Sequence, residues 1–100
     1  MTLTTLRPAF LRTSPDGSWG IIDSFTDAQG ISFDCPCCGK KHRIVCWFDD
    51  RGTPSAIAAD RGRWVASGSG LADLTLSPSI HLLGGCAWQG SVTNGEVTSA

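Results

Sequence analysis

Apolar and polar residues alternate along several short runs of this chain, a pattern typical of β-strands that bury one face. Residues 19–25, 31–35 and 42–48 predict three strands, and turn-forming residues separate the first two. The first two strands are expected to pair antiparallel. The second leads into a cysteine-rich turn, and the third leaves it, so this turn lies between two strands.

The second half of the chain predicts shorter elements. Residues 63–66 and 71–76 are expected to form strands, and Pro78 places the end of the latter at a sheet edge or a bend, because proline cannot donate to a strand ladder. An Asn-Gly pair within residues 91–98 predicts a tight hairpin of type I′. Residues 55–60 are the one place where a short helix is expected.

These elements predict one small domain of the mainly β class. Residues 1–17 show no apolar period and contain turn-forming residues, so we expect an extended N-terminal arm there. Residues 18–100 are expected to form a single zinc-ribbon-like domain, since 100 residues with 41% apolar content correspond to one folding unit. The predicted fold is a small antiparallel sheet built around a metal site, with little helix.

The candidate chemistry lies in residues 35–46, which hold four of the five cysteines and one of the two histidines. Cys35 and Cys38 are two residues apart, so both thiolates can face one ion if the chain turns sharply between them. Pro36 and Gly39 favour such a turn. Thiolates in a tetrahedral Cys/His site are typical of structural zinc. We therefore predict Zn²⁺, with Cys35 and Cys38 as its first two ligands.

The remaining ligands stay open at this stage. Cys86 is flanked by glycines and could form a second knuckle, and Cys37 could replace its neighbour Cys38. His42 is either a ligand or a surface residue. Cys46 shares a strand face with apolar residues, which favours a small buried side chain over a ligand.

Charge adds little general attraction for a partner, because the net charge is −1. Lys40, Lys41 and Arg43 form a local basic run, which we interpret as a solvated turn, with a phosphate-contacting patch as the alternative. No apolar run approaches the ~20 residues of a membrane span, and the first residues lack the apolar core of a secretory signal. We therefore expect a cytoplasmic protein without membrane contact, with reduced cysteines that favour metal binding.

Three motifs occur in a characteristic order: CPCCG at 35–39, LSPSI at 76–80 and CAWQ at 86–89, followed by an Asn-Gly hairpin. In this order and spacing the chain resembles an uncharacterised family of small proteins found in phages, prophages and bacteria, some of whose bacterial members neighbour ubiquitin-like conjugation genes. The resemblance covers residues 33–97. It implies a zinc-binding β fold with ligands drawn from Cys35, Cys37 or Cys38, and Cys86.

One position departs from this family, because Gln89 stands where its pattern has a histidine. Glutamine is a poor zinc ligand, so His42, Cys37 or water completes the site, or the site is weakened. A site completed by water would resemble a catalytic one with an open position, and we rank a closed structural site above it.

From these features we predict a non-enzymatic, zinc-stabilised interaction module, a phage-type accessory protein that binds a host or virion protein and lies in the host cytoplasm or the virion. The motif serines Ser77 and Ser79 are expected to brace the knuckles by hydrogen bonds. A nucleic-acid-binding knuckle is the alternative, with an enzyme that uses an open zinc site, or Cys37 beside His42, as the third reading.

Overall fold

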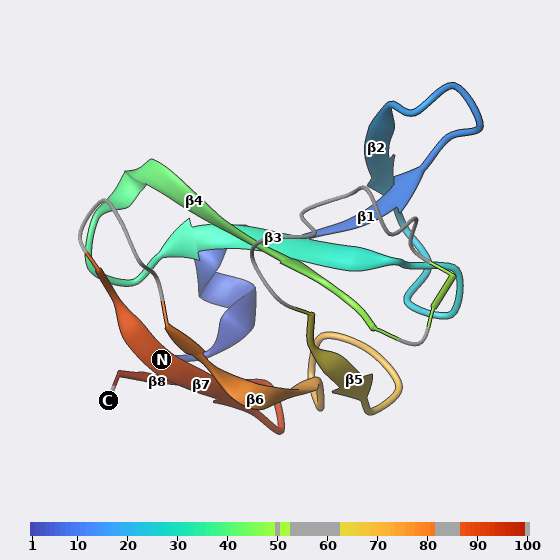
Figure 1. Cartoon of the computed structure of the whole chain (residues 1–100). Coiled ribbons are helices and arrows are strands. Elements are labelled where there is room, and N and C mark those ends of the chain that lie inside the picture. The colour runs from blue at the N-terminus through green and yellow to red at the C-terminus, as the bar shows by residue number, and fades with distance from the viewer. Residues whose placement is uncertain (50, 53–62, 82–86, 100) are drawn as a thin grey trace.

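The computed structural model describes residues 1–49, 51–52, 63–81 and 87–99, apart from the side chains of Lys40 and Lys41. Within this part the chain forms one short 3-10 helix, η1 (Leu3–Leu6), and eight strands in two sheets (Figure 1). The first sheet has the order β2-β1-β3-β4 and the second the order β5-β6-β7-β8, with every pairing antiparallel. The prediction of a mainly β, antiparallel fold is confirmed, with the strands divided between two sheets.

The strand bounds of the first sheet are β1 (Ala9–Thr13), β2 (Trp19–Ile22), β3 (Gly30–Cys35) and β4 (Gly39–Trp47). Those of the second sheet are β5 (Val65–Ser67), β6 (Thr75–His81), β7 (Gln89–Thr93) and β8 (Glu96–Ser99).

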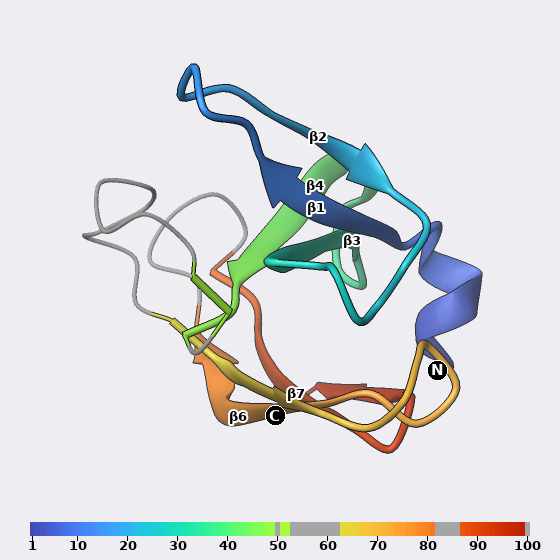
Figure 2. The ribbon, with the colours of Figure 1, turned by 90° about the vertical axis from the view of Figure 1, so that its right-hand side faces the viewer.

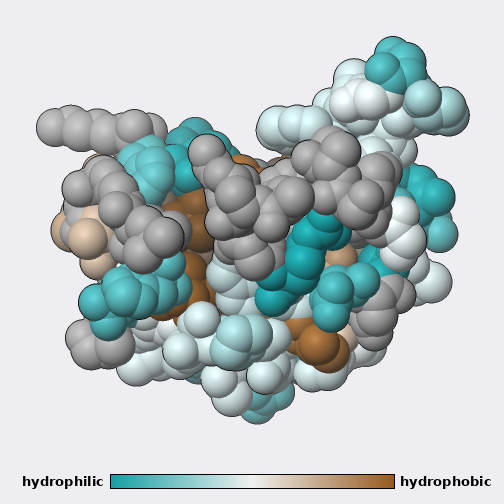
Figure 3. Space-filling model, viewed as in Figure 1, coloured by the Kyte–Doolittle hydropathy of each residue, from teal (hydrophilic) through white to brown (hydrophobic). Residues whose placement is uncertain are grey.

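The two sheets lie one above the other with η1 at one side, as Figure 2 shows. Alternate residues of each strand point into the space between them, which is the geometry expected of strands with one buried face. The core is made of apolar side chains from both sheets and from η1; it contains Leu3, Leu6, Phe10, Ile31, Phe33, Ile44, Cys46, Phe48, Leu74, Leu76, Ile80, Trp88, Val92 and Val97. On the face seen in Figure 3, apolar surface is limited to small areas among hydrophilic ones.

The first 17 residues contribute a strand to the first sheet and backbone hydrogen bonds to the hairpin of the second. Strand β1 lies inside the first sheet, between β2 and β3. The backbone N–H of Leu3 donates to the Gly95 carbonyl oxygen at 2.9 Å, and that of Val97 donates to the Met1 carbonyl oxygen at 2.7 Å. The segment predicted as an extended arm thus spans from the β7–β8 hairpin to the middle of the first sheet.

Local turn chemistry matches the predicted hairpin at the end of the chain. Asn94 and Gly95, between β7 and β8, both have positive φ, at 52° and 78°. A type I′ turn requires this conformation at its two central residues, and Asn-Gly is its favoured pair. The helix predicted at 55–60 lies outside the described residues. Among the described residues, no helix has the length and apolarity needed to cross a membrane.

Candidate functional site

A group of cysteine and histidine side chains forms where β3 ends and β4 begins. The Sγ atoms of Cys35 and Cys38 and a ring nitrogen of His42 all lie within 4.8 Å of one another. Cys35 ends β3 on the inner face of the sheet, Cys38 belongs to the turn, and His42 lies on β4. Gly39 has φ of 65°, the left-handed conformation expected at the end of this turn.

The chemistry of this group fits a metal ion. Cys35 is fully buried, and Nδ1 of His42 is buried without a hydrogen-bond partner among the described residues. A buried ring nitrogen with no partner is unfavourable by about 1–3 kcal/mol, and coordination to an ion would satisfy it. Two thiolates and one imidazole are ligands of soft and borderline ions. These three residues could therefore hold a metal ion.

Of the other predicted ligands, the described part of the chain places only Cys37, and it lies outside this group. Cys37 is exposed. Cys46 is fully buried in the apolar core, and this burial raises the pKa of its thiol to about 12, so it stays a neutral thiol as its strand position suggested. Cys86 lies outside the described residues. Gln89 begins β7, in the second sheet.

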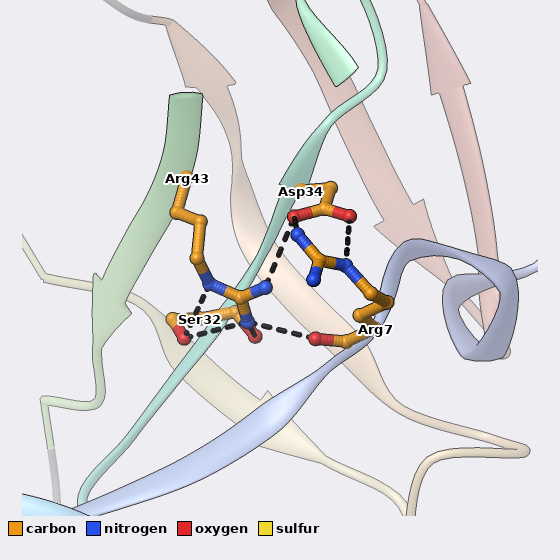
Figure 4. Close-up of polar contacts among 4 residues, drawn as sticks. All are labelled: Arg7, Ser32, Asp34 and Arg43. Atoms are coloured by element: carbon orange, nitrogen blue, oxygen red, sulfur yellow. Dashed lines mark hydrogen bonds and ion pairs between the residues drawn. The ribbon is translucent and has the colours of Figure 1, made fainter. Parts of the chain in front are cut away.

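A polar cluster lies on the outer face of β3 and β4, close to the group of Cys35, Cys38 and His42, which we call the metal group (Figure 4). Arg7 donates two hydrogen bonds to the Asp34 carboxylate, from Nε to Oδ2 at 2.7 Å and from Nη2 to Oδ1 at 2.9 Å. Arg43 donates from Nη1 to Asp34 Oδ1 at 3.0 Å, and from Nη2 to Ser32 Oγ at 2.9 Å and the Arg7 carbonyl at 2.7 Å. The hydrogen bond from Arg7 is the main reason that the pKa of Asp34 is lowered, although burial opposes it.

This cluster positions the candidate ligands, because Asp34 precedes Cys35 and Arg43 follows His42 in the sequence. Arg43 joins β4 to β3 on the outer face, and Arg7, which precedes β1, binds the same carboxylate on β3. Cys35 lies on the opposite, inner face of β3. Arg43 is therefore engaged in holding the two strands together.

The second sheet carries a different kind of site, a cleft of about 230 Å³ over β6, β7 and β8. Its lining contains no aspartate, glutamate, lysine or arginine, and consists of Ser79, Ile80, His81, Gln89, Gly90, Ser91, Thr98 and Ser99. Ile80 is buried at 1% exposure, while Ser79 and His81 on either side of it are exposed. Alternation along β6 therefore places the hydroxyl and the imidazole on the same outer face.

Side chains of β7 and β8 complete the lining of the cleft. Gln89 on β7 lies directly opposite His81, and Ser91 on the same strand lies opposite Thr98 on β8. Opposite residues in an antiparallel pair have Cβ atoms about 4.5–5.5 Å apart, close enough for side chains to interact. The chain contains only two histidines. His42 belongs to the cysteine group, and His81 lies in this cleft, two residues after Ser79 on the same strand.

Sequence interpretation missed this second site. It assigned Ser77 and Ser79 to bracing the knuckles and gave no role to His81, although His81 follows Ser79 by two residues. A serine and a histidine two residues apart, on the exposed face of a strand, were the sequence signal that could have indicated this site. Gln89, considered only as a failed metal ligand, lines the cleft instead.

Comparison with known proteins gives one family. The family model described as "Bacterial ubiquitination-like system serine protease (BubE)" matches residues 7–100. No curated protein and no solved structure shows a significant match.

This match corrects three predictions drawn from the sequence. The expectation of a non-enzymatic interaction module is wrong, because the matching family consists of serine proteases. The negative prediction for enzymatic activity is wrong for the same reason. The description as a phage accessory protein of unknown function is also wrong, since the family is assigned to a bacterial ubiquitination-like system. The physical reason is that a protease needs only a few side chains in the right mutual geometry, which leave a weaker sequence signal than a cysteine motif with regular spacing.

Proposed function

We propose that this chain, which belongs to the BubE family of serine proteases of bacterial ubiquitination-like systems, cleaves amide bonds in a polypeptide substrate of such a system. Ser79 is the nucleophile and His81 is the general base. One observation supports this assignment. Ser79 and His81, on either side of the buried Ile80, share the exposed face of β6 that lines the cleft.

The spacing suits a serine–histidine pair. Residues two apart on a strand are separated by two rises of about 3.3 Å, and their side chains point the same way. An imidazole on that spacing can reach the neighbouring hydroxyl, and such contacts often shorten only when substrate is bound. His42 cannot serve in this role while it faces the cysteine group. His81 is therefore the histidine left for acid–base chemistry.

The reaction then follows the usual course of a serine peptidase. Ser79 Oγ attacks the carbonyl carbon of the scissile amide and passes its proton to His81. The tetrahedral intermediate collapses, the C–N bond breaks, and His81 gives its proton to the leaving amine. Water, deprotonated by His81, attacks the resulting Ser79 ester. The second collapse breaks the ester C–O bond and releases the carboxylic acid, while His81 returns the proton to Ser79 Oγ.

Neutral polar side chains surround this pair. Gln89 lies opposite His81, and we assign it the role of accepting a hydrogen bond from the imidazole N–H, as a carboxylate or carboxamide does in serine and cysteine proteases. The hydroxyls of Ser91 and Thr98 supply donors near a developing oxyanion. The small, uncharged lining accommodates an extended backbone with small side chains next to the scissile bond.

The metal group has a different role in this proposal. Cys35, Cys38 and His42 would hold zinc, which favours Cys and His ligands, and Cys86 is the candidate for the fourth ligand that the sequence suggests. With Cys86 as a ligand, a bound ion would link the β3–β4 turn to a residue that is distant in the sequence. The ion stabilises the fold and takes no part in the cleavage.

A fluorophosphonate probe, which reacts with activated serines, tests the peptidase assignment. We expect one adduct per chain by intact mass, located on Ser79 by peptide mapping. The adduct is lost in Ser79→Ala and forms at least about 100-fold more slowly in His81→Ala, since general base catalysis contributes about 10²–10⁴-fold. Ser77→Ala is the matched control, a serine of the same strand that is also exposed, and labels at the wild-type rate.

Two outcomes would contradict the proposal. Full labelling of Ser79→Ala would show that another residue is the nucleophile. A wild-type chain that binds its metal, is folded by circular dichroism and takes up no probe would argue against peptidase activity altogether.

A further inference from the structure

Strand β2 is the edge strand of the first sheet in the described part of the chain. Among the described strands it pairs with β1 alone, through the register Phe10↔Ile22 to Thr13↔Trp19. Together the two strands form a hairpin that projects beyond β3 and β4 (Figure 1). An edge strand has backbone N–H and C=O groups along its outer side that can pair with another extended chain.

This edge lacks the features that usually protect one. The strand consists of Trp19, Gly20, Ile21 and Ile22, with neither a charged residue nor a proline. Ile21 is 71% exposed and Trp19 is 52% exposed. The two side chains alternate with Gly20, so they lie on the same face of the strand.

The exposed pair continues an apolar strip on the outer face of the first sheet. The Trp19 ring meets the ring of Trp47 edge-on, with centroids 5.9 Å apart and planes at 81°. Ile21 lies opposite Leu11, and Leu11 lies opposite Gly30. An added strand would therefore extend an apolar surface that already exists, instead of starting a new one.

Charge at the ends of β2 indicates what kind of strand fits. Residues 14–24 contain two charged side chains, Asp16 before the strand and Asp23 after it, and both are exposed. Hydrogen bonds from Ser18 lower the pKa of Asp16 and keep its carboxylate ionised. The nearest arginine on β1, Arg12, lies opposite Gly20, which places it on the other face, and it donates to the Asp27 carbonyl oxygen at 2.7 Å.

A second copy of the chain fits this edge poorly. Antiparallel pairing of β2 with itself would gather one Asp16 and one Asp23 at each end of the pair. Like charges brought together across strands are destabilising. The same two carboxylates would instead attract basic residues that flank a short apolar segment.

We propose that the open edge of β2 binds an extended segment of a partner polypeptide, apolar in its centre and basic at both ends, which adds to the first sheet as a fifth strand. Backbone hydrogen bonds along β2 hold the segment, and its apolar side chains pack against Trp19 and Ile21. Asp16 and Asp23 pair with its flanking basic residues. The four residues of β2 present about 13 Å of edge, at about 3.3 Å per residue. This binding does not depend on the peptidase assignment.

The test is a titration of the full-length, ¹⁵N-labelled protein with the peptide Lys-Lys-Val-Thr-Val-Thr-Lys-Lys, followed by amide chemical shifts. We expect the largest shifts at residues 19–22. Ile21→Lys should weaken binding at least about tenfold, as loss of a packed central anchor does. Asp16→Asn/Asp23→Asn should also weaken it, more at low salt than at high salt. Val65→Lys is the matched control, since Val65 is another exposed apolar strand residue, 49% exposed, on β5.

Three results would overturn the proposal. One is the absence of shifts at millimolar peptide, and another is equal binding by Ile21→Lys and by wild type. The third is self-association that depends on Ile21, measured by sedimentation, which would make a second copy the occupant. Equal affinity for a peptide with glutamates in place of the lysines would remove the electrostatic part of the argument.

Discussion

Asp34 is nearly buried, with 7% of its side chain exposed, and it accepts hydrogen bonds from Arg7 and Arg43. These contacts lower its pKa in the folded state. A group with a lowered folded pKa stabilises the fold above its unfolded value, about 3.9 for aspartate, and this contribution is lost as the pH falls through the folded pKa.

We therefore predict that Asp34→Asn is less stable than wild type at pH 7, and that the difference shrinks as the pH falls below about 4. Urea unfolding from pH 7 to pH 2 measures this. Asp23→Asn, which removes an exposed carboxylate, should track wild type. A difference that stays constant over the whole range would show that shape, and not charge, makes Asp34 important.

Some side-chain roles could be predicted from the sequence, and others required the fold. Cys35 and Cys38 were predicted from spacing, and the inward position of Cys46 from alternation. Contacts across long sequence separations leave no local signal. Arg7 and Asp34 are 27 residues apart, and His81 meets its neighbour Gln89 only through the β6–β7 register.

The first sheet depends on Gly30, the glycine that begins β3. Gly30 lies opposite Trp47, and a Cβ added there would come within 2.8 Å of Trp47 Cε3 and 3.0 Å of the Cys46 carbonyl oxygen. The indole ring therefore lies over a position where no side chain fits.

Gly30→Ala should accordingly destabilise the protein by about 1–3 kcal/mol, the usual effect of overpacking a filled site. Gly20→Ala is the control within the same sheet, because an added Cβ there meets nothing within 4 Å. Chemical denaturation compares the two. Loss of stability in both variants would assign the effect to glycine in strands generally, and not to the contact with Trp47.

Strands with clear alternation were easier to predict than those without it. Residues 31–35 lie within β3, and the predicted strand 42–48 overlaps β4, which begins earlier, at Gly39, and ends at Trp47. Strand β1 was missed because two adjacent residues, Phe10 and Leu11, are both buried, one toward the core and one under the outer face. The β7–β8 hairpin was predicted correctly, because its Asn-Gly turn is a purely local signal.

The division into two sheets could not be seen in the sequence. Each strand signals that it has a buried face, but not which other strands cover that face. The sheets are joined where Phe48 bridges Trp64, with Trp64 N–H donating to the Trp47 carbonyl at 3.0 Å, and where the first residues meet the β7–β8 hairpin. Consequently, the metal group belongs to the first sheet, whereas Ser79 and His81 belong to the second.

This separation yields a prediction about the whole molecule. Removing the metal with a chelator, or by Cys35→Ser or His42→Ala, should lower the melting temperature by at least about 5 °C, since about 1 kcal/mol shifts a domain of this size by 4–8 °C. Cys37→Ser, outside the group, should melt like wild type. Below the melting temperature of the metal-free protein, the fluorophosphonate probe should still label Ser79, because the ion supports the fold and not the reaction. Loss of labelling in a chelated chain that is still folded would mean instead that the ion acts in the cleft, and an unchanged melting temperature would mean that the group holds no structural metal.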